Sequence, residues 1–340
     1  MEHSEYGRLY DTLWHYLNDG GRQTSLFGER CQRLAREAFL SCAAGSTMPI
    51  VYLEVPLIGT PCFDLQVCID RSALEGAVSV PGNAPAHERD LLTWLAGPQG
   101  AECAGMDLAF DLRAGDATTP QLIALLNEGS FASAEEFFEL VGAPDGARRY
   151  RAAEQRVPRG WRSWYTGIIP GRSGSPVRLD YFVSRRAVRA YRGDSRLLAR
   201  DLSQLGYRLS ERQCGWCERL LPLPCRLNLQ LDARADGTMG PVLGYNLIEG
   251  SLGPSATRQR LEGGWMRQVL EMCEAWGIAD ERWHQLKELS QAKALMIDGL
   301  KTGSGRVVLS ITPTFLKVRM TADELVDAKA YIMCTFREMP

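Results

Sequence analysis

The sequence lacks an excess of either charge. Its 39 Lys and Arg residues face 41 Asp and Glu residues, which gives a net charge of −2. A chain with this balance has no bulk electrostatic reason to bind nucleic acid or an anionic membrane. It also lacks a run of about 18 uncharged apolar residues, the length that a membrane-spanning helix needs. The N-terminus is polar and acidic, unlike a signal peptide, so we expect a cytosolic protein without nucleic-acid or membrane partners.

Cysteine and histidine are too few and too scattered to build a scaffold or a metal site. The ten Cys residues form about 3% of the chain, far below a disulfide-rich protein. Cys214 and Cys217 form a CxxC pair, but no second pair follows, and the chain has only four His residues. A structural zinc site would need four ligands. We therefore expect no residues dedicated to a metal.

Short motifs that identify common nucleotide and hydrolase sites are missing as well. The chain has neither GxxxxGK[ST] nor a GxGxxG after a strand, and neither HExxH nor GxSxG. It has no DDxxD-type run that would hold a magnesium–diphosphate cluster. The information must lie in the order of the elements and in the residues that line them.

What the sequence does contain is a regular alternation of helical and strand-like periods. The expected strands are 50–57, 62–69, 106–113, 162–169, 177–183, 224–234, 240–249, 306–313, 314–320 and 328–336. The expected helices are 5–18, 28–44, 86–97, 119–128, 133–142, 145–156, 195–205, 211–221, 256–276 and 280–299. Short turns make paired strands antiparallel. No linker divides the chain, so we expect a single domain over 1–340.

Several strands alternate between a fully apolar and a fully polar face. In the run 225-CRLNLQLDAR, three Leu residues alternate with Arg226, Asn228, Gln230 and Asp232. An antiparallel sheet with helices on one face has this pattern. If the sheet closes, the polar faces line the inside, and ten strands leave room for a chamber. We favour this α+β barrel of repeated ααββ units, with helices outside, over an open sheet whose polar face is solvated.

Four strands place cations or a phenol on their polar faces. The six residues are Arg178, Arg226, Lys317, Arg319, Lys329 and Tyr331. The last four form two pairs at a spacing of two, so the members of each pair share a face. A ring of cations and hydroxyl donors suits a diphosphate, because it offsets the charge of that group. The alternative is a set of ion pairs on a solvated sheet.

Glu54 lies on the first strand, in phase with Tyr52. Burial would raise its pKa toward neutral and let it orient or deprotonate a nucleophile. The alternative is an exposed carboxylate on the sheet surface.

Further residues on the polar faces are candidates for the lining of the chamber. Asp64, Gln66, Asp107 and Asp111 would line its acceptor side or help to hold a metal. Trp164, which shares a face with Arg162 on its strand, would stabilise an allylic cation. The predicted lining is Tyr52, Asp64, Gln66, Trp164 and Asn228.

The ααββ order, the polar inner faces, and the K-x-R and K-x-Y strands (Lys317 with Arg319, Lys329 with Tyr331) resemble the aromatic prenyltransferases of the ABBA barrel class. Within that class the chain is most similar to the peptide prenyltransferases of cyanobactin-type biosynthesis. One departure is that the second repeat shows only one clear strand, at 106–112, before a helix-rich stretch.

The resemblance implies a prenyl diphosphate co-substrate, dimethylallyl or geranyl, with Mg²⁺ in the peptide-modifying members. It implies transfer to an electron-rich side chain of a peptide, in the biosynthesis of ribosomally made peptide natural products. It also implies that Glu54 faces the acceptor and that the six residues named above bind the diphosphate. Two alternatives remain, a prenyltransferase for a small aromatic metabolite and a non-catalytic protein that presents a peptide to a partner enzyme.

Overall fold

The computed structural model describes residues 5–18, 26–41, 50–71, 86–113, 120–126, 131–168, 176–249, 253–297 and 305–339. The strands are β1 (Ile50–Pro56), β2 (Asp64–Asp70), β3 (Cys103–Phe110), β4 (Gln121–Leu126), β5 (Trp161–Ile168), β6 (Val177–Val183), β7 (Arg226–Ala233), β8 (Leu243–Ile248), β9 (Gln291–Met296), β10 (Arg306–Met320) and β11 (Leu325–Glu338). The α-helices are α1 (Glu5–Leu17), α2 (Glu29–Ser41), α4 (Ala86–Ala96), α5 (Phe131–Leu140), α6 (Pro144–Glu154), α7 (Arg185–Gly193), α8 (Arg196–Gln204), α9 (Glu211–Leu220), α10 (Pro254–Gly263), α11 (Trp265–Ala275) and α12 (Leu286–Leu289). Short 3₁₀ helices span Gln99–Glu102 and Glu281–Gln285.

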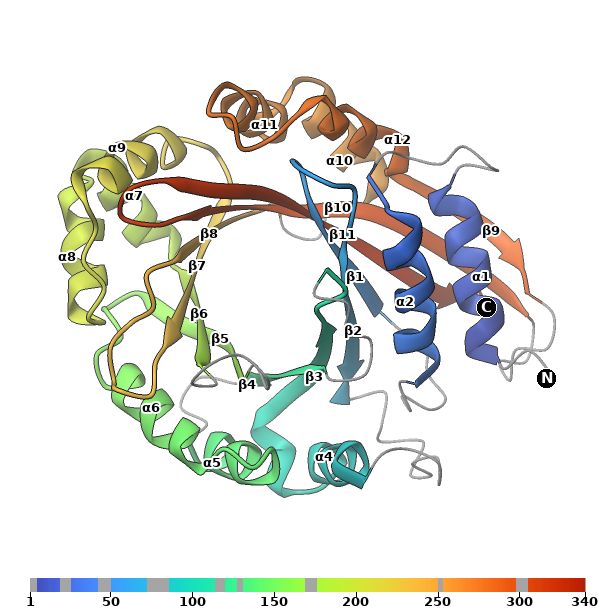
Figure 1. The fold of residues 1–340 in the computed structure, drawn as a ribbon, viewed down its shortest axis with the longest axis horizontal. Helices are drawn as coiled ribbons and strands as arrows, with labels where there is room; N and C mark the ends of the chain where they lie inside the picture. The colour runs from blue at the N-terminus through green and yellow to red at the C-terminus, as the bar shows by residue number, and fades with distance from the viewer. Residues whose placement is uncertain are drawn as a thin grey trace.

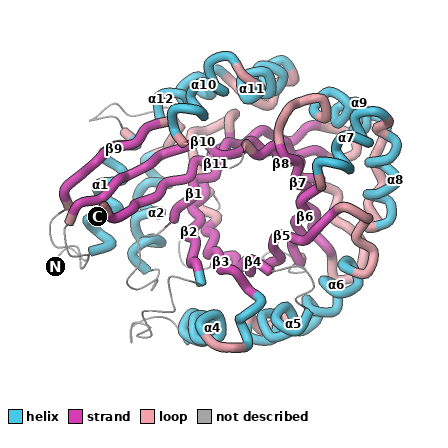
Figure 2. Tube along the Cα trace, turned by 180° about the vertical axis from the view of Figure 1, so that it is seen from behind, coloured by secondary structure: helices cyan, strands magenta, loops and turns pink. Residues whose placement is uncertain are grey.

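The strands form one sheet that closes on itself. Neighbours pair antiparallel in the order β11-β1-β2-β3-β4-β5-β6-β7-β8-β10, and β10 pairs with β11 to complete a ring of ten strands. β9 lies outside the ring, because it pairs with the first part of β10 whereas β8 pairs with the last part. Figures 1 and 2 show the ring from opposite sides with the helices around it. The predicted ten-stranded antiparallel barrel with outer helices is confirmed.

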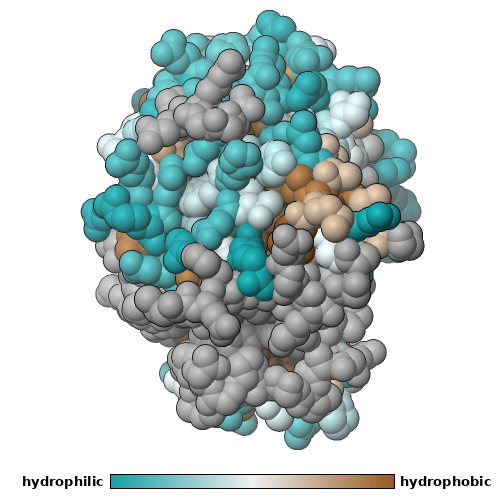
Figure 3. Space-filling view, turned by 90° about the vertical axis from the view of Figure 1, so that its right-hand side faces the viewer, coloured by the Kyte–Doolittle hydropathy of each residue, from teal (hydrophilic) through white to brown (hydrophobic). Residues whose placement is uncertain are grey.

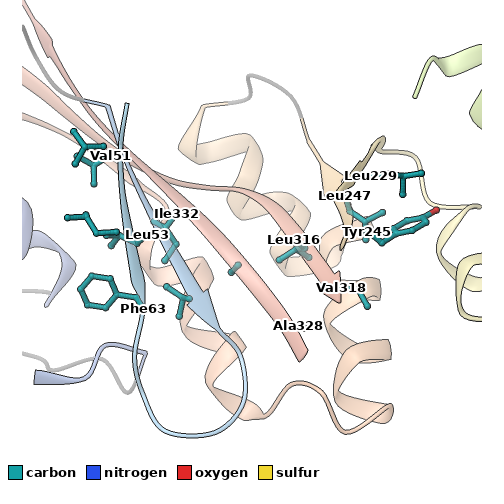
Figure 4. Close-up of a cluster of buried hydrophobic side chains, with 14 of the residues drawn as sticks. Val51, Leu53, Phe63, Leu229, Tyr245, Leu247, Leu316, Val318, Ala328 and Ile332 are labelled. Atoms are coloured by element: carbon teal, nitrogen blue, oxygen red, sulfur yellow. The ribbon is translucent and has the colours of Figure 1, made fainter. Parts of the chain in front are cut away.

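The hydrophobic core lies between the barrel and its helices. On β7, Leu227, Leu229 and Leu231 are almost completely buried on the outer face, while the polar residues between them point inward. Figure 4 shows part of this layer, with outward side chains of β1, β7, β8, β10 and β11. Each buried methylene contributes about 0.8 kcal/mol. The apolar half of the alternation therefore fixes which face turns outward.

One face of the described surface is mostly hydrophilic. Figure 3 shows this face, at the right of Figure 1, where most of the described residues are hydrophilic and a small hydrophobic patch lies among them. Among the described residues the exposed large hydrophobic side chains are Leu40, Leu140, Met296 and Val326. None of the described helices has the length and apolar character needed to cross a bilayer.

The helix predicted at 119–128 is wrong, because 121–126 forms β4. Gln121, Ile123 and Leu125 face the inside of the barrel, where the last two form an apolar part of the wall. Leu122 and Leu126 are buried on the outer face. With apolar residues on both faces, the segment has no polar–apolar alternation, and its period does not identify a strand. β4 supplies the strand that the second repeat lacked.

The strands predicted at 306–313 and 314–320 are one continuous strand, β10. The pairing with β11 shifts by one residue between Pro313 and Phe315, so a bulge accommodates the proline, which has no backbone N–H. The predicted number of ring strands was therefore right through two compensating errors, one strand split and one missed.

Three helix predictions also need correction. The helix expected at 280–299 ends at Leu289, and β9 follows as an added strand at the edge of the sheet. The helix expected at 256–276 is two helices, α10 and α11, separated at Gly264. α7 was not predicted, although Ser184 caps it by accepting a hydrogen bond from the backbone N–H of Ala187.

Candidate active site

The inward-facing side chains of the barrel enclose a cavity of about 350 Å³. Its lining is charged at the end where β1, β3, β7 and β10 finish and where β2, β6 and β11 begin. Farther along the strands the lining is mainly aromatic and aliphatic, with polar residues from β2, β3 and β8 that include Gln66, Asp70, Asp107 and Asn246. The cavity is therefore chemically different at its two ends.

We call the ionisable residues at the first end the charged collar. The charged collar consists of Glu54, Asp64, Asp111, Arg113, Arg178, Asp232, Lys317, Arg319 and Lys329. Strand register brings these residues together, since Glu54 lies opposite Asp64 and Lys317 lies opposite Lys329. Residues from six strands and one strand end thus meet around one opening.

Glu54 accepts hydrogen bonds from the Lys329 ammonium group and from the Tyr331 hydroxyl. Burial acts to raise the pKa of the Glu54 carboxyl, as the sequence led us to expect. The charges of Lys329 and Lys317 and the two hydrogen bonds outweigh burial and hold that pKa well below its usual value. Glu54 is therefore an ionised, weakly basic carboxylate that positions Lys329 and Tyr331.

Lys317 is buried, with only 3% of its surface exposed. Its Nζ donates hydrogen bonds to Gln230 Oε1 at 2.6 Å and to the Tyr331 hydroxyl at 3.2 Å. Burial lowers the pKa of Lys317 to about 7, although the Glu54 carboxylate opposes this shift. Among the described residues, no carboxylate forms an ion pair with Lys317. An anion in the cavity would supply the missing counter-charge.

The three Arg residues of the charged collar each pair with an Asp. The pairs are Arg113 with Asp64 at 2.6 Å, Arg178 with Asp232 at 3.1 Å, and Arg319 with Asp327 at 2.6 Å. A guanidinium group carries five N–H donors, so it can keep its carboxylate partner and still donate to a phosphate oxygen. The Asp partners hold the Arg side chains in fixed orientations at the cavity wall.

An aromatic wall follows the charged collar. Phe315 stacks on Tyr331 with ring centroids 3.9 Å apart, and Tyr52 lies 6.2 Å from Phe315. Across the cavity, Trp164 lies 5.4 Å from Tyr165. Electron-rich ring faces of this kind stabilise a nearby cation by about 0.5–2 kcal/mol each.

A bulge in β5 places both Trp164 and Tyr165 on the inside. The pairing with β6 shifts between Ser163 and Tyr165, which leaves Trp164 as an extra residue. Strict alternation had predicted Trp164 on one face and Tyr165 on the other. Trp164 faces the cavity as predicted, and Tyr165 joins it.

On the other side, β2 and β3 contribute a small polar cluster, which we call the β2–β3 wall (Gln66, Cys68 and Asp107). Gln66 Nε2 donates a hydrogen bond to Asp107 Oδ2 at 2.6 Å. Asp107 is only 3% exposed. Burial raises its pKa to about 6, although the neighbouring Cys68 thiol and the hydrogen bond from Gln66 act in the opposite direction.

Most of the residues that the sequence nominated lie around this cavity. Those that line it are Tyr52, Glu54, Asp64, Gln66, Asp107, Asp111, Trp164, Arg178, Lys317, Arg319, Lys329 and Tyr331. Arg226 does not: it is exposed at the first residue of β7, six residues and about 20 Å along the strand from the collar residue Asp232. Asn228 is fully buried and donates to Asp180 while accepting from Asn246, so it supports the wall without lining it.

Sequence reasoning did not nominate several residues that line the cavity. Among them are Arg113, Tyr165, Gln230 and Phe315. A spacing of two from Lys317 would have found Phe315, and the same spacing from Asp111 would have found Arg113. Nothing local signals the bulge that turns Tyr165 inward.

A protein site for Mg²⁺ would need carboxylates or other oxygen ligands that converge on one point. Within the described ranges, no three His, Cys, Asp or Glu side chains converge as ligands. Glu54 and Asp64 face each other, but each is bonded to a cation of the charged collar. The described residues therefore do not form a metal site of their own, and the expected role of Mg²⁺ stays a prediction.

Solved structures with this fold include two that match over nearly the whole chain. The crystal structure of 5-dimethylallyltryptophan synthase from Streptomyces coelicolor matches with a TM-score of 0.52 and 12% identity, over 96% of each chain. That of AnaPT from Neosartorya fischeri matches with a TM-score of 0.52 and 10% identity, over 99% of this chain and 94% of that one. At such identities the likeness concerns the fold alone. No protein-family model and no curated protein matches the sequence.

Proposed function

We propose that the protein transfers an isoprenyl group from an allylic diphosphate to an electron-rich aromatic acceptor. The observation that carries the proposal is the position of the charged collar beside the aromatic wall in one closed cavity. Five cations and the Tyr331 hydroxyl would bind the diphosphate, and the rings of Phe315, Tyr331 and Trp164 would surround the hydrocarbon. A fold shared with a dimethylallyltryptophan synthase supports the same reading.

The reaction would begin with heterolysis of the bond between C1 of the isoprenyl chain and the diphosphate oxygen. The electron pair leaves with the diphosphate, whose added charge Lys317, Lys329 and Tyr331 would stabilise. The π electrons of the acceptor then form the new bond to C1. The attacked ring atom loses a proton, so the products are the prenylated acceptor, diphosphate and H⁺.

Exclusion of water is the second requirement, because water would capture the allylic cation. Tyr331 and Phe315 stack between the charged collar and the rest of the cavity. A pair of rings in this place would cover the cation without offering it a nucleophile. Glu54 would act by holding Lys329 and Tyr331 in position.

The finer proposal, taken from the sequence, is that the acceptor ring belongs to a peptide side chain. The name of the dimethylallyltryptophan synthase supports the alternative of a small aromatic acceptor. Competition between free tryptophan and an N-acetylated, C-amidated tryptophan tripeptide would decide, with product formation followed by mass spectrometry. The remaining alternative, a module that presents a peptide on an open sheet, is less well supported, because the ten ring strands have no free edge.

The first test is calorimetric titration of the protein with dimethylallyl and geranyl S-thiolodiphosphate, with and without Mg²⁺. We expect saturable binding that raises the melting temperature. Inorganic phosphate, which offers a single anionic group, serves as the control and should bind much more weakly. A folded sample that binds neither donor analogue would contradict the proposed function.

A further inference from the structure

Asp107 has a carboxylate oxygen that the described protein leaves unsatisfied. Its Oδ2 accepts the hydrogen bond from Gln66, but Oδ1 is buried and has no hydrogen-bond partner of normal geometry among the described residues. The thiol of Cys68, a weak donor, is its neighbour across the β2–β3 pairing. A buried acceptor without a partner is costly, so an unpaired carboxylate oxygen in a cavity wall points to a ligand.

No described cation contacts Asp107. The groups that face it are Gln66 and Cys68 from β2 and the apolar Ile123 from β4, and Tyr52 of β1 is close enough to feel its charge. The cations of the cavity belong to the charged collar. Cys68, the register partner of Asp107, lies four residues from Asp64 along β2, which corresponds to about 13 Å.

We infer that Asp107 binds an N–H group of the acceptor, either the ring N–H of an aromatic heterocycle or a protonated amine beside the ring. This inference rests on the proposed function and adds the class of acceptor, a nitrogenous aromatic compound. The acceptor would then lie between the β2–β3 wall and the aromatic wall, with the diphosphate at the charged collar. Asp107 is thus a specificity residue for the acceptor.

Gln66 makes the polarity of this subsite testable. Its amide donates to Asp107 Oδ2, so an Asn at position 107 would turn its oxygen toward Gln66 and its NH₂ group toward the cavity. Asp107→Asn therefore replaces an acceptor of hydrogen bonds by a donor with almost no change in shape.

The experiment compares three probes on the full chain by calorimetry, each with and without geranyl S-thiolodiphosphate. The probes are 3-methylindole, which has only a ring N–H, 1,3-dimethylindole, which has no N–H, and tryptamine, which has a ring N–H and an ammonium group. We expect the wild type to bind at least one N–H probe roughly 10- to 100-fold more tightly than 1,3-dimethylindole. A preference for both N–H probes assigns the ring N–H, and a preference for tryptamine alone assigns the ammonium group.

Asp107→Asn should abolish that preference while binding of the thiolodiphosphate stays within about twofold of the wild type. Asp145→Asn, which removes the same charge on the exposed surface of α6 outside the barrel, is the matched control and should keep the preference. If Asp107→Asn does not fold, Gln66→Ala leaves the charge but removes its orienting bond, and the preference should fall by a smaller factor.

The inference is overturned if the wild type binds all three probes equally, or if Asp107→Asn keeps the wild-type preference. If the wild type does not bind the thiolodiphosphate, that result contradicts the proposed function instead. Because the probes are also titrated without the donor analogue, the role of Asp107 is decided in either case.

Discussion

The charged collar and the β2–β3 wall face the same cavity, but they satisfy their buried charges differently. In the charged collar, Lys329 and the three Arg residues each have a carboxylate partner within the described protein. In the β2–β3 wall, Asp107 has a hydrogen bond from Gln66 and no cation. The protein therefore orients these four cations of the charged collar by itself, whereas Asp107 needs a ligand to complete its hydrogen bonding.

The fold controls the orientation of the side chains in the charged collar. At Asp107 it controls which ligand is selected. Removing one member of a buried ion pair leaves the other uncompensated, so the charged collar combines binding with stability. Asp107 carries no such pair, and its replacement should affect the ligand more than the fold.

Lys329→Ala should reduce turnover about 10²- to 10³-fold, because it removes a cation at the leaving group. It should also destabilise the protein, because Glu54 loses the partner that holds its pKa low. The double variant Lys329→Ala with Glu54→Gln separates the two effects. Urea unfolding should show recovered stability, while a product assay shows no recovery of turnover; recovery of both would mean that Lys329 acts only through the fold.

Donor binding should weaken as the pH rises above 7, by up to about tenfold for each pH unit. The pKa of Lys317 is lowered to about 7, so the free enzyme loses this proton near neutral pH. A bound diphosphate raises that pKa again, and the complex takes up a proton at pH 8. Calorimetry in two buffers of different ionisation enthalpy measures the uptake.

Lys317→Met is the control for this effect, since it has nothing to titrate at that position. The variant should bind the thiolodiphosphate weakly and without proton uptake between pH 7 and 9. An unchanged uptake in Lys317→Met would assign the proton to another group of the charged collar.

Phe315→Leu should reduce transfer roughly 2- to 30-fold and increase the share of prenyl alcohol formed by water capture. The reason is that the Leu side chain has no π face for the cation that Phe315 and Tyr331 would cover. Phe315→Tyr keeps the ring and should retain most of the transfer. Chromatography of both products measures the ratio, and equal ratios in the wild type and Phe315→Leu would remove the shielding role.

Arg226→Ala should change donor affinity by less than about twofold, since exposed charges far from a ligand contribute little. The residue is exposed at the end of β7 that lies away from the charged collar. The sequence had placed it in the diphosphate site. A large loss of affinity on titration with the thiolodiphosphate would restore that earlier assignment.

The residues that the sequence located correctly are those whose position depends on local spacing. Lys317 with Arg319, and Lys329 with Tyr331, share a face because side chains alternate along any strand. All four line the cavity, as does Glu54. Alternation alone, however, could not place Glu54 beside Lys329, because that contact depends on the pairing of β1 with β11.

The misplaced residues depend on long-range pairing. The sequence predicts a helix where the structure has β4, because the inner face of this strand is apolar where it meets the cavity. Tyr165 was assigned to the wrong face because a bulge opposite β6 shifts the alternation by one residue. Arg226 lies on the predicted face of its strand, but at the end of the strand away from the charged collar. Alternation predicts the face of a side chain and not its position along the barrel axis.

Hydrophobic period and spacing were enough to predict the order of most helices and strands, the polar inner faces of most strands, and the in-phase pairs of cations. They could not predict that the sheet closes through the β10–β11 pairing, that five cations meet at one end of the cavity, or that Asp107 keeps an unpaired oxygen at its wall. Those features depend on the register between strands distant in the chain, and register is set by the packing of the whole barrel.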